Sequence, residues 1–152
     1  MVEERVRQLG LVIPKVAPPV AAYQPGVLAG DLLFVSGQLP TVDGELKYRG
    51  RLGAELTVEE GYQAARACAL NCLAVVKSFT GSLDRVVRIV KLNGYVSSAP
   101  DFFQQPQVVN GASELLGEVF GEAGRHARAA IGVSSLPLGA AVEVDLVVQV
   151  LL

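Results

Sequence analysis

Hydrophobic and polar residues alternate with period two near the C-terminal end of the chain, which predicts a strand with one buried face. The residues of the predicted buried face are Val142, Val144, Leu146, Val148 and Val150. Those of the opposite face are Glu143, Asp145, Val147 and Gln149. Another strand-like run begins at Arg128, and Leu136-Pro137 marks the connection between the two. Two strands are therefore expected to close the chain.

Two longer segments have the pattern of helices. Thr57-Val58-Glu59-Glu60 fits a capping box, in which Thr57 caps the helix and Glu60 reaches back to the backbone. The predicted bounds are Thr57 to about Ser78, with Gly81 beyond the end, and Pro106 or Gln107 to Phe120, with Gly121 and Gly124 beyond the end. A short helix from Glu3 to Leu9 is expected before an arm marked by Pro14, Pro18 and Pro19.

The remaining hydrophobic runs predict three further strands. These are Ala21 to Leu28, Leu32 to Ser36 and Arg85 to Val96, with turns at Gly30-Asp31 and at Val42-Asp43-Gly44-Glu45. The order of strands, helix, strand, helix and two strands predicts an α+β fold, a mixed sheet with two main helices on one face. A chain of 152 residues is long enough for one well-buried domain, so residues 1–152 are expected to form a single domain.

The composition is rich in apolar residues and poor in charged ones, at 51% and 18%. The apolar run from Ala64 to Val76 contains Arg66 and Asn71 and is too short to cross a bilayer, so no membrane span is expected. The excess of apolar residues instead predicts a homo-oligomer. The N-terminus has no basic start followed by an apolar core, which favours a cytoplasmic protein. A net charge of −2 without a cluster of basic residues disfavours nucleic-acid binding.

The residue types that hold metals or serve as nucleophiles are scarce. Cys68 and Cys72 are spaced for one helix face, and two small thiols in an Ala-rich helix are best explained as core filling. His126 is the only histidine, so no metal cluster is expected, and we expect it to lie in a turn and bond locally. A Ser/His/Asp triad would need His126 as its base, and Ser134 and Ser135 are nearby without a nucleophile elbow. No phosphate-binding loop is present.

Four positions have both a structural and a functional interpretation. Arg128 and Glu143 stand in strands where an unpaired buried charge is costly, so they form either a structural ion pair, solvated ends or a site. Tyr23 is a half-buried strand aromatic in the structural interpretation. Gly37 within Ser36-Gly37-Gln38 permits either close approach of a ligand or a β-bulge, with equal weight.

Taken together, these motifs resemble the RidA/YjgF family of reactive-intermediate deaminases from about Pro19 onward. The strongest match is Arg128, then Ile131, Val133, Leu136-Pro137 and Val142-Glu143-Val144. The second is Ser36-Gly37-Gln38-Leu39-Pro40, with Tyr23 upstream, and a weaker third is Val109-Asn110 at the second helix. All three occur in the family's order.

The resemblance implies a chorismate-mutase-like fold that assembles as a homotrimer with sites between subunits. It also implies hydrolysis of 2-imino acids or their enamine tautomers to 2-keto acids and ammonia, without a metal or organic cofactor. In this assignment Arg128 holds the substrate carboxylate and Glu143 orients water and exchanges protons. Tyr23, Ser36 and Gly37 shape the substrate pocket, and Asn110 assists from the second helix.

The chain departs from the family pattern in several places. Ala130 stands where members often carry Cys or a small polar residue, and His126 stands where Pro is frequent. Residues 1–18 form an N-terminal extension, and extra residues occur around 44–56 and 99–111, as in a longer-chained branch of the family. Two alternatives to the deaminase therefore stay open, a trimer that binds a small carboxylate without catalysis and, with less support, an endoribonuclease.

Overall fold

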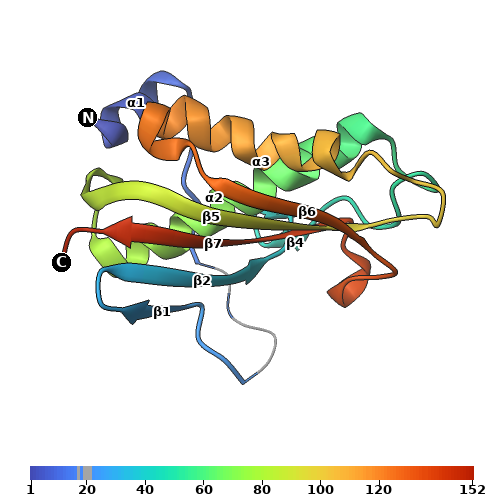
Figure 1. The fold of residues 1–152 in the computed structure, drawn as a ribbon, viewed down its shortest axis with the longest axis horizontal. Helices are drawn as coiled ribbons and strands as arrows, with labels where there is room; N and C mark the ends of the chain where they lie inside the picture. The colour runs from blue at the N-terminus through green and yellow to red at the C-terminus, as the bar shows by residue number, and fades with distance from the viewer. Residues whose placement is uncertain (17, 19–21) are drawn as a thin grey trace.

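The computed structural model describes residues 1–16, 18 and 22–152. A five-stranded sheet in the order β1-β2-β7-β5-β6 forms one layer, and α2 and α3 cover one of its faces (Figure 1). The strands of this sheet are β1 (Gly26–Ala29), β2 (Leu32–Gln38), β5 (Val86–Ser97), β6 (Ala127–Val133) and β7 (Val142–Val150). The helices are α1 (Val2–Gln8), α2 (Val58–Thr80) and α3 (Gln105–Phe120). The predicted α+β architecture is confirmed.

The sheet is mixed because of one crossover connection. Each neighbouring pair in the row β1-β2-β7-β5 is antiparallel, whereas β5 and β6 are parallel. Parallel neighbours need a long connection, which α3 provides between β5 and β6. The short segments between these elements are a hairpin of β3 (Thr41–Val42) and β4 (Glu45–Leu46), and the 3₁₀ helices η1 (Leu83–Arg85), η2 (Gly121–Gly124) and η3 (Pro137–Gly139). β6 is therefore left at one edge of the sheet.

The helix ends follow the local signals in the sequence. The Oγ1 of Thr57 accepts from the N–H of Glu60 at 3.2 Å, and the Glu60 carboxylate accepts from the N–H of Thr57 at 2.9 Å, so the capping box is confirmed. α2 continues two residues past the predicted end, to Thr80, and Gly81 ends it in the left-handed region at φ 83°. α3 begins at Gln105, which places Pro106 in the first turn, where its missing N–H costs nothing.

The predicted strand from Ala21 to Leu28 is wrong at its start. β1 begins at Gly26, and the preceding residues 22–25 are not strand, whereas Ala21 lies outside the described residues. Pro25 has no N–H to give to a sheet ladder, which accounts for the late start of the strand. Tyr23 consequently lies in the segment before β1, with 45% of its surface exposed.

The core lies between the sheet and the two long helices. β7 alternates between buried and half-buried residues along its whole length, as its period-two pattern predicts. Cys68 and Cys72 are completely buried on α2, with their sulfurs 3.5 and 3.4 Å from the carbonyl oxygens of Val142 and Val144. They fill space against β7, and burial raises the pKa of both thiols well above its usual range.

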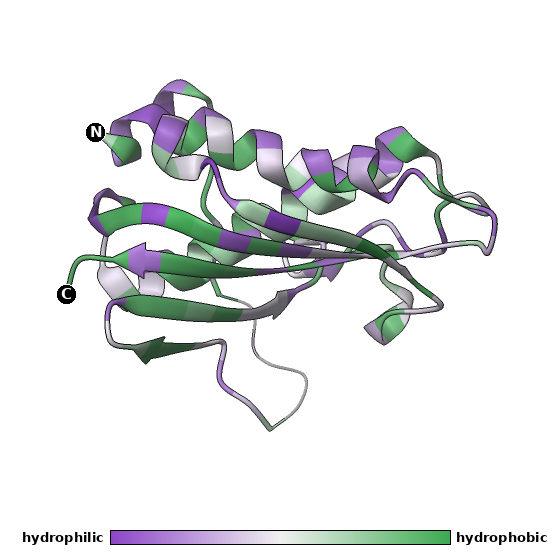
Figure 2. Ribbon diagram, viewed as in Figure 1, coloured by the Kyte–Doolittle hydropathy of each residue, from purple (hydrophilic) through white to green (hydrophobic). Residues whose placement is uncertain are grey.

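The face of the sheet that the helices leave uncovered is apolar in several places. Hydrophobic residues run along β1, β2 and β7 in Figure 2. Val27, Phe34 and Ile131 are respectively 54%, 46% and 48% exposed. Phe34 pairs with Val27 on one side and with Val147 on the other, so these side chains share the face opposite the helices. Within the described residues, no helix combines the length and hydropathy needed to span a membrane.

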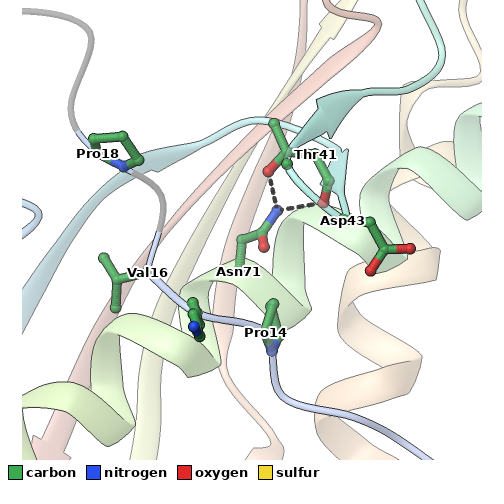
Figure 3. A pocket seen from close by; sticks show the side chains of 8 residues that line it. Pro14, Val16, Pro18, Thr41, Asp43 and Asn71 are labelled. Atoms are coloured by element: carbon green, nitrogen blue, oxygen red, sulfur yellow. Dashed lines mark hydrogen bonds between the residues drawn. The ribbon is translucent and has the colours of Figure 1, made fainter.

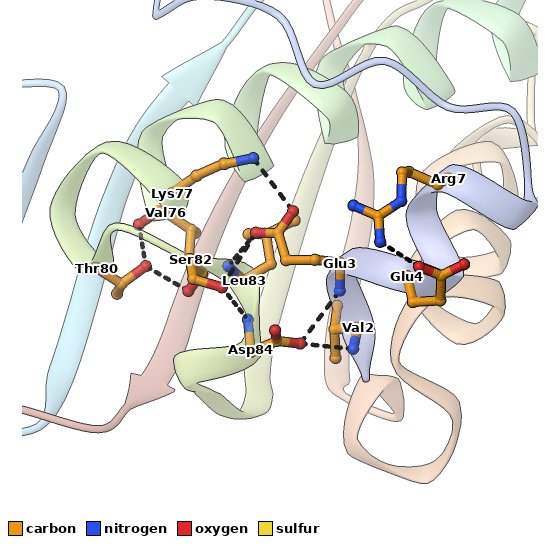
Figure 4. A network of polar contacts seen from close by, with 10 residues as sticks. All are labelled: Val2, Glu3, Glu4, Arg7, Val76, Lys77, Thr80, Ser82, Leu83 and Asp84. Carbon is orange, nitrogen blue, oxygen red and sulfur yellow. Dashed lines mark hydrogen bonds and ion pairs between the residues drawn. The ribbon is translucent and has the colours of Figure 1, made fainter.

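The N-terminal helix is fastened to the rest of the molecule by two carboxylates (Figure 4). The Glu3 side chain accepts from the N–H of Leu83 at 2.7 Å and from the ammonium of Lys77 at 3.2 Å. Asp84 in turn accepts from the N–H groups of Val2 and Glu3, at 2.7 and 3.2 Å, which are free at a helix start. α1 therefore starts on η1 and runs along α3.

A pocket of about 590 Å³ separates the N-terminal arm from the β3–β4 hairpin (Figure 3). Buried Asn71 lies at its base, and its amide nitrogen donates to the carbonyl oxygens of Leu39 and Thr41 at 2.9 and 3.0 Å. It also donates to the Thr41 hydroxyl at 2.9 Å. Asn71 thus fixes the hairpin to α2.

Candidate functional site

Arg128 lies on the edge strand β6 with its side chain directed at α3. Its Nη1 donates to the Asn110 Oδ1 at 2.8 Å and to the Ser113 Oγ at 3.2 Å. The side chain is half-buried at the mouth of an open pocket of about 310 Å³. That pocket is lined by Ser113, Gly117, Gly124, Arg125, His126 and Arg128. The structure therefore brings together Arg128 and Asn110, which were predicted separately as site residues.

His126 belongs to the same pocket through a hydroxyl that the sequence analysis did not single out. Its Nε2 lies 2.8 Å from the Ser113 Oγ, and its Nδ1 lies 2.7 Å from the carbonyl oxygen of Gly124. The second contact is the expected local bond. Burial lowers the pKa of His126, the Gly124 carbonyl partly offsets this, and the Arg128 charge lowers it further.

Ser113 could have been found from helix periodicity. It follows Asn110 by three residues on α3, which puts both on one helix face. Ser134 and Ser135, the serines considered as partners for His126, instead lie in the connection between β6 and β7. Closeness in the sequence pointed to the wrong serines, because the packing of α3 against β6 decides which hydroxyl contacts the imidazole.

Glu143 and Gly37 form a second group on β7 and β2. The register shifts between Val35 and Gln38, so a β-bulge is present at Ser36-Gly37. A Cβ added to Gly37 would collide with the carboxylate oxygen Oε2 of Glu143. The β-bulge is therefore confirmed, and the missing side chain of Gly37 makes room for the Glu143 carboxylate. Close approach of a ligand stays a prediction.

The protonation of Glu143 is shifted by its surroundings. Burial raises the pKa of Glu143, and the nearby carboxylate of Asp145 raises it further. Asp145 is itself held as an acceptor by the Asn93 amide at 2.9 Å and the Tyr95 hydroxyl at 3.0 Å. Burial and this bond raise the pKa of Tyr95 to about 12, so its hydroxyl keeps its proton at neutral pH. Burial and Asp145 thus both favour the protonated form of Glu143.

Ser36 connects this group to the segment that carries Tyr23. Its hydroxyl donates to the carbonyl oxygen of Gln24 at 2.5 Å, and its N–H donates to that of Pro25 at 2.9 Å. The residues beside Tyr23 are therefore fastened to the end of β2. Gly37 contacts Glu143 and Ser36 precedes it in the bulge, whereas Tyr23 lies in the exposed segment before β1.

Within one chain, Arg128 and Glu143 lie on opposite faces of the sheet. Arg128 pairs with Leu92, which pairs with Leu146, and both leucines are buried beneath the helices. Paired residues of neighbouring strands point to the same face, and successive residues alternate. Glu143, an odd number of residues from Leu146, therefore faces away from the helices. β5 also separates the two strands, so one chain presents Arg128 and Glu143 in two separate groups.

No group of three or more His, Cys, Asp or Glu side chains is arranged to hold a metal ion within the part of the chain that the structure describes. Neither the group around Arg128 nor the group around Glu143 contains such a cluster. The positively charged Arg128 side chain can bind an anion, and the Glu143 carboxyl can accept or donate a proton.

Comparison with known proteins places the chain in one family. Residues 3–150 match the family described as "YjgF/chorismate_mutase-like, putative endoribonuclease". Protein TCP17 of Trypanosoma cruzi is 51% identical over 149 residues, which cover 97% of this chain and 93% of TCP17. The crystal structure of the protein Atu1372 of Agrobacterium tumefaciens, whose function is unknown, is 45% identical with a TM-score of 0.91, covering 98% of this chain and 92% of that one.

A second crystal structure extends the match over almost the whole fold. It is that of a "putative endoribonuclease" from Shewanella oneidensis MR-1, 39% identical with a TM-score of 0.96 and covering 99% of both chains. The two TM-scores show that the overall fold and the matched length agree with these structures. The chain therefore belongs to the YjgF/chorismate-mutase-like family, also named RidA/YjgF.

Proposed function

We propose that this protein hydrolyses 2-imino acids, or their enamine tautomers, to 2-keto acids and ammonia. The observation that carries the proposal is the Arg128 guanidinium in its open pocket. Both hydrogen bonds that described residues make with this side chain use Nη1. Nη2 and Nε stay available to hold a substrate carboxylate in a two-point contact. Asn110 orients the guanidinium through its side-chain oxygen.

Glu143 supplies the proton exchange that imine hydrolysis requires. The carboxylate takes a proton from water as the water oxygen attacks the carbon of the protonated imine, which gives a carbinolamine. The carboxylic acid then returns that proton to the nitrogen. The regenerated carboxylate takes the hydroxyl proton as the C–N bond breaks, the carbonyl forms and ammonia leaves. Burial and the Asp145 carboxylate raise the pKa of Glu143, so it holds a proton more readily than an exposed carboxyl and can pass it to the nitrogen. Gly37 supports this role because it leaves room for the carboxylate.

We place the complete site between two copies of the chain. Arg128 of one copy and Glu143 of the next would face one cleft, with Tyr23, Ser36 and Gly37 beside Glu143. A homotrimer with three such clefts fits the position of Arg128 and Glu143 on opposite faces of the sheet. It would also cover the exposed apolar side chains of Val27, Phe34 and Ile131.

We place the activity in the cytoplasm, where pyridoxal-phosphate-dependent enzymes release such imines. Cys68 and Cys72 are free thiols buried one turn apart on α2. Free cysteines kept reduced are typical of that compartment, which supports the assignment.

The test measures clearance of imines that an amino-acid oxidase generates from amino acids with side chains of different sizes. Semicarbazide traps the imine that escapes hydrolysis. We expect the wild-type protein to lower the trapped fraction, and Arg128→Ala to abolish this effect. Arg85→Ala is the matched control, because Arg85 lies before β5, seven residues from Leu92, which pairs with Arg128, and bonds the carbonyl of Leu151. It should keep wild-type activity.

The same proteins separate the deaminase from a carboxylate-binding trimer. Binding of 2-ketobutyrate that depends on Arg128, without clearance of any imine by the wild-type protein, would contradict the deaminase and favour binding without catalysis. The trapped fraction as a function of side-chain size would then define the preferred substrate if clearance occurs.

A further inference from the structure

Four groups on α3, η2 and β6 form one continuous chain of hydrogen bonds that ends at Arg128. The Gly124 carbonyl oxygen is 2.7 Å from Nδ1 of His126, whose Nε2 is 2.8 Å from the Ser113 hydroxyl. That hydroxyl oxygen is 3.2 Å from Nη1 of Arg128. The contacts join a backbone atom to the guanidinium through two side chains.

The direction of every bond in this chain follows from the donor capacity of each group. A carbonyl oxygen only accepts, so Nδ1 of His126 donates to Gly124 and carries the proton. The Nε2 of a neutral imidazole then accepts, which requires the Ser113 hydroxyl to donate its single hydrogen to it. The lone pairs of Ser113 are thereby turned toward the Arg128 N–H. The donor or acceptor role of each group therefore fixes the role of the next group.

We propose that Ser113 and His126 are positioning residues that hold the Arg128 guanidinium in the orientation that binds the ligand carboxylate. This inference rests on the proposed function in one respect, that Arg128 is the carboxylate-binding group. Ser113 acts on Arg128 directly, and His126 acts through Ser113. Asn110 accepts from the same Nη1 at 2.8 Å, so Asn110 and Ser113 hold the guanidinium together and His126 holds Ser113.

The charges around His126 favour the neutral imidazole that this arrangement needs. Arg128 on β6 is two residues away, and Arg125 precedes the imidazole in the chain. Arg88 on β5 donates to the Arg125 carbonyl at 2.9 Å, and Glu122 in η2 lies 3.5 Å from the Arg125 guanidinium. On α3, Ser113 is the group in contact. Glu122 is thus engaged by Arg125, and the cation nearest to the imidazole network is Arg128.

A ligand carboxylate on Arg128 adds a negative charge close to this network. Such a charge stabilises the imidazolium form, so binding of a keto acid raises the pKa of His126. The chain contains one histidine, and its ring signals in an NMR spectrum therefore belong to His126 without further assignment. The tautomer and the titration of the network are directly observable.

The first experiment is ¹⁵N NMR of the histidine ring in the wild-type protein and in Ser113→Ala and Arg128→Ala, each with and without 2-ketobutyrate. We expect the Nδ1–H tautomer in the wild-type protein, a shifted Nε2 signal in Ser113→Ala, and a ligand-induced rise in the His126 pKa that Arg128→Ala removes. An Nε2–H tautomer, or an Nε2 signal unchanged by Ser113→Ala, overturns the proposal whether or not imines are hydrolysed.

The second experiment measures the affinity for 2-ketobutyrate and, where imines are cleared, the apparent KM and kcat. Ser113→Ala should weaken keto-acid binding and raise KM about tenfold, with a smaller change in kcat. Ser113→Thr keeps the hydroxyl and should restore most of the affinity. His126→Gln, whose side-chain oxygen can accept from Ser113, should lie between the wild-type protein and His126→Phe.

These readouts separate the inference from the proposed function. Keto-acid binding weakened by Ser113→Ala and rescued by Ser113→Thr supports the positioning role even if no imine is cleared. A folded Ser113→Ala protein with unchanged keto-acid affinity and unchanged KM overturns it. If the His126 variants do not fold, the Ser113 pair decides the question alone, because its two members differ mainly in the hydroxyl.

Discussion

Gly37 shows most directly how a single residue shapes the candidate site. The carboxylate of Glu143 lies over its backbone, in the place that a side chain would occupy. A β-bulge at the same position shifts the register between β2 and β7. The observed position of the Glu143 carboxylate therefore requires that residue 37 have no side chain, and the substitution of Gly37 tests this.

Gly37→Ala should displace Glu143 and lower imine clearance at least tenfold. The added methyl group should also destabilise the protein by about 1–3 kcal/mol, because it overpacks the contact. Urea unfolding and the semicarbazide assay measure the two effects.

Glu143→Ala provides the partner for a double-mutant cycle with Gly37→Ala. Shortening Glu143 removes the collision, so adding Gly37→Ala to Glu143→Ala should cost much less stability than adding it to the wild-type protein. Equal costs in both backgrounds would show that Gly37 does not act through Glu143. Activity should be absent from the double variant in either case.

At the scale of elements, the close contact of α2 and α3 depends on a glycine. A Cβ at Gly111 on α3 would collide with the backbone carbonyl oxygen of Tyr62 on α2. The same helix carries Gly117, where an added Cβ has no neighbour within 4 Å. The two glycines thus offer a matched comparison within one helix.

Gly111→Ala should destabilise the protein by about 1–3 kcal/mol, since backbone atoms of α2 cannot move aside as a flexible side chain does. Gly117→Ala should stabilise it by about 0.5–1 kcal/mol, because alanine is the better helix former in open space. Urea unfolding of both variants measures the difference. If the two substitutions changed the free energy of unfolding in the same direction, the packing described for α3 would be contradicted.

The attachment of α1 to η1 should depend on pH through Glu3. Burial raises the pKa of Glu3, but the N–H of Leu83 and the ammonium of Lys77 lower it more, so the pKa lies below its ordinary value of 4.5. Because the pKa is lower in the folded state, ionised Glu3 stabilises the attachment at pH values above 4.5, the ordinary pKa. This contribution is lost as the pH falls through the lowered pKa.

Glu3→Gln should therefore weaken the protection of α1 amides from hydrogen exchange at pH 7 by about 1 kcal/mol. The difference from the wild-type protein should shrink as the pH falls below 4.5, the ordinary value. Glu4→Gln is the control, because Glu4 is exposed and pairs with Arg7 on the same helix. A difference that persists unchanged into acid would show that the Glu3 charge has no role.

At the scale of the whole molecule, the sheet separates Arg128 from Glu143. Each residue faces a different side, so the proposed cleft takes one from each of two copies. Arg128→Ala and Glu143→Gln should each be inactive when expressed alone. Co-expression in equal amounts should recover about one quarter of wild-type activity, because that fraction of interfaces joins an intact Arg128 to an intact Glu143.

Gel filtration and the imine assay on the co-expressed protein measure this recovery. A trimer with restored activity agrees with sites between copies. A site contained in one chain would give no recovery, since every chain would then lack one of the two residues. The mixture of separately folded trimers serves as the control, and it should remain inactive unless subunits exchange.

The elements of this fold were predictable because their signals are local. The capping box at Thr57, the glycine after α2 and the period-two pattern of β7 depend on neighbouring residues only. The start of β1 was misjudged because Pro25 removes a ladder hydrogen bond, which the run of apolar residues does not reveal. Arg128, Asn110, Glu143 and Gly37 were identified from motifs, but their distances from one another were not.

By itself, the sequence determined the order of strands and helices, the buried face of β7 and the candidate residues, because propensity, capping and periodicity act over a few positions. The tertiary structure alone decided that Ser113 meets His126 and that Arg128 and Glu143 occupy opposite faces. Those relations depend on strand register and on how α3 packs against β6. Both are set by contacts between residues far apart in the chain, which no local pattern specifies.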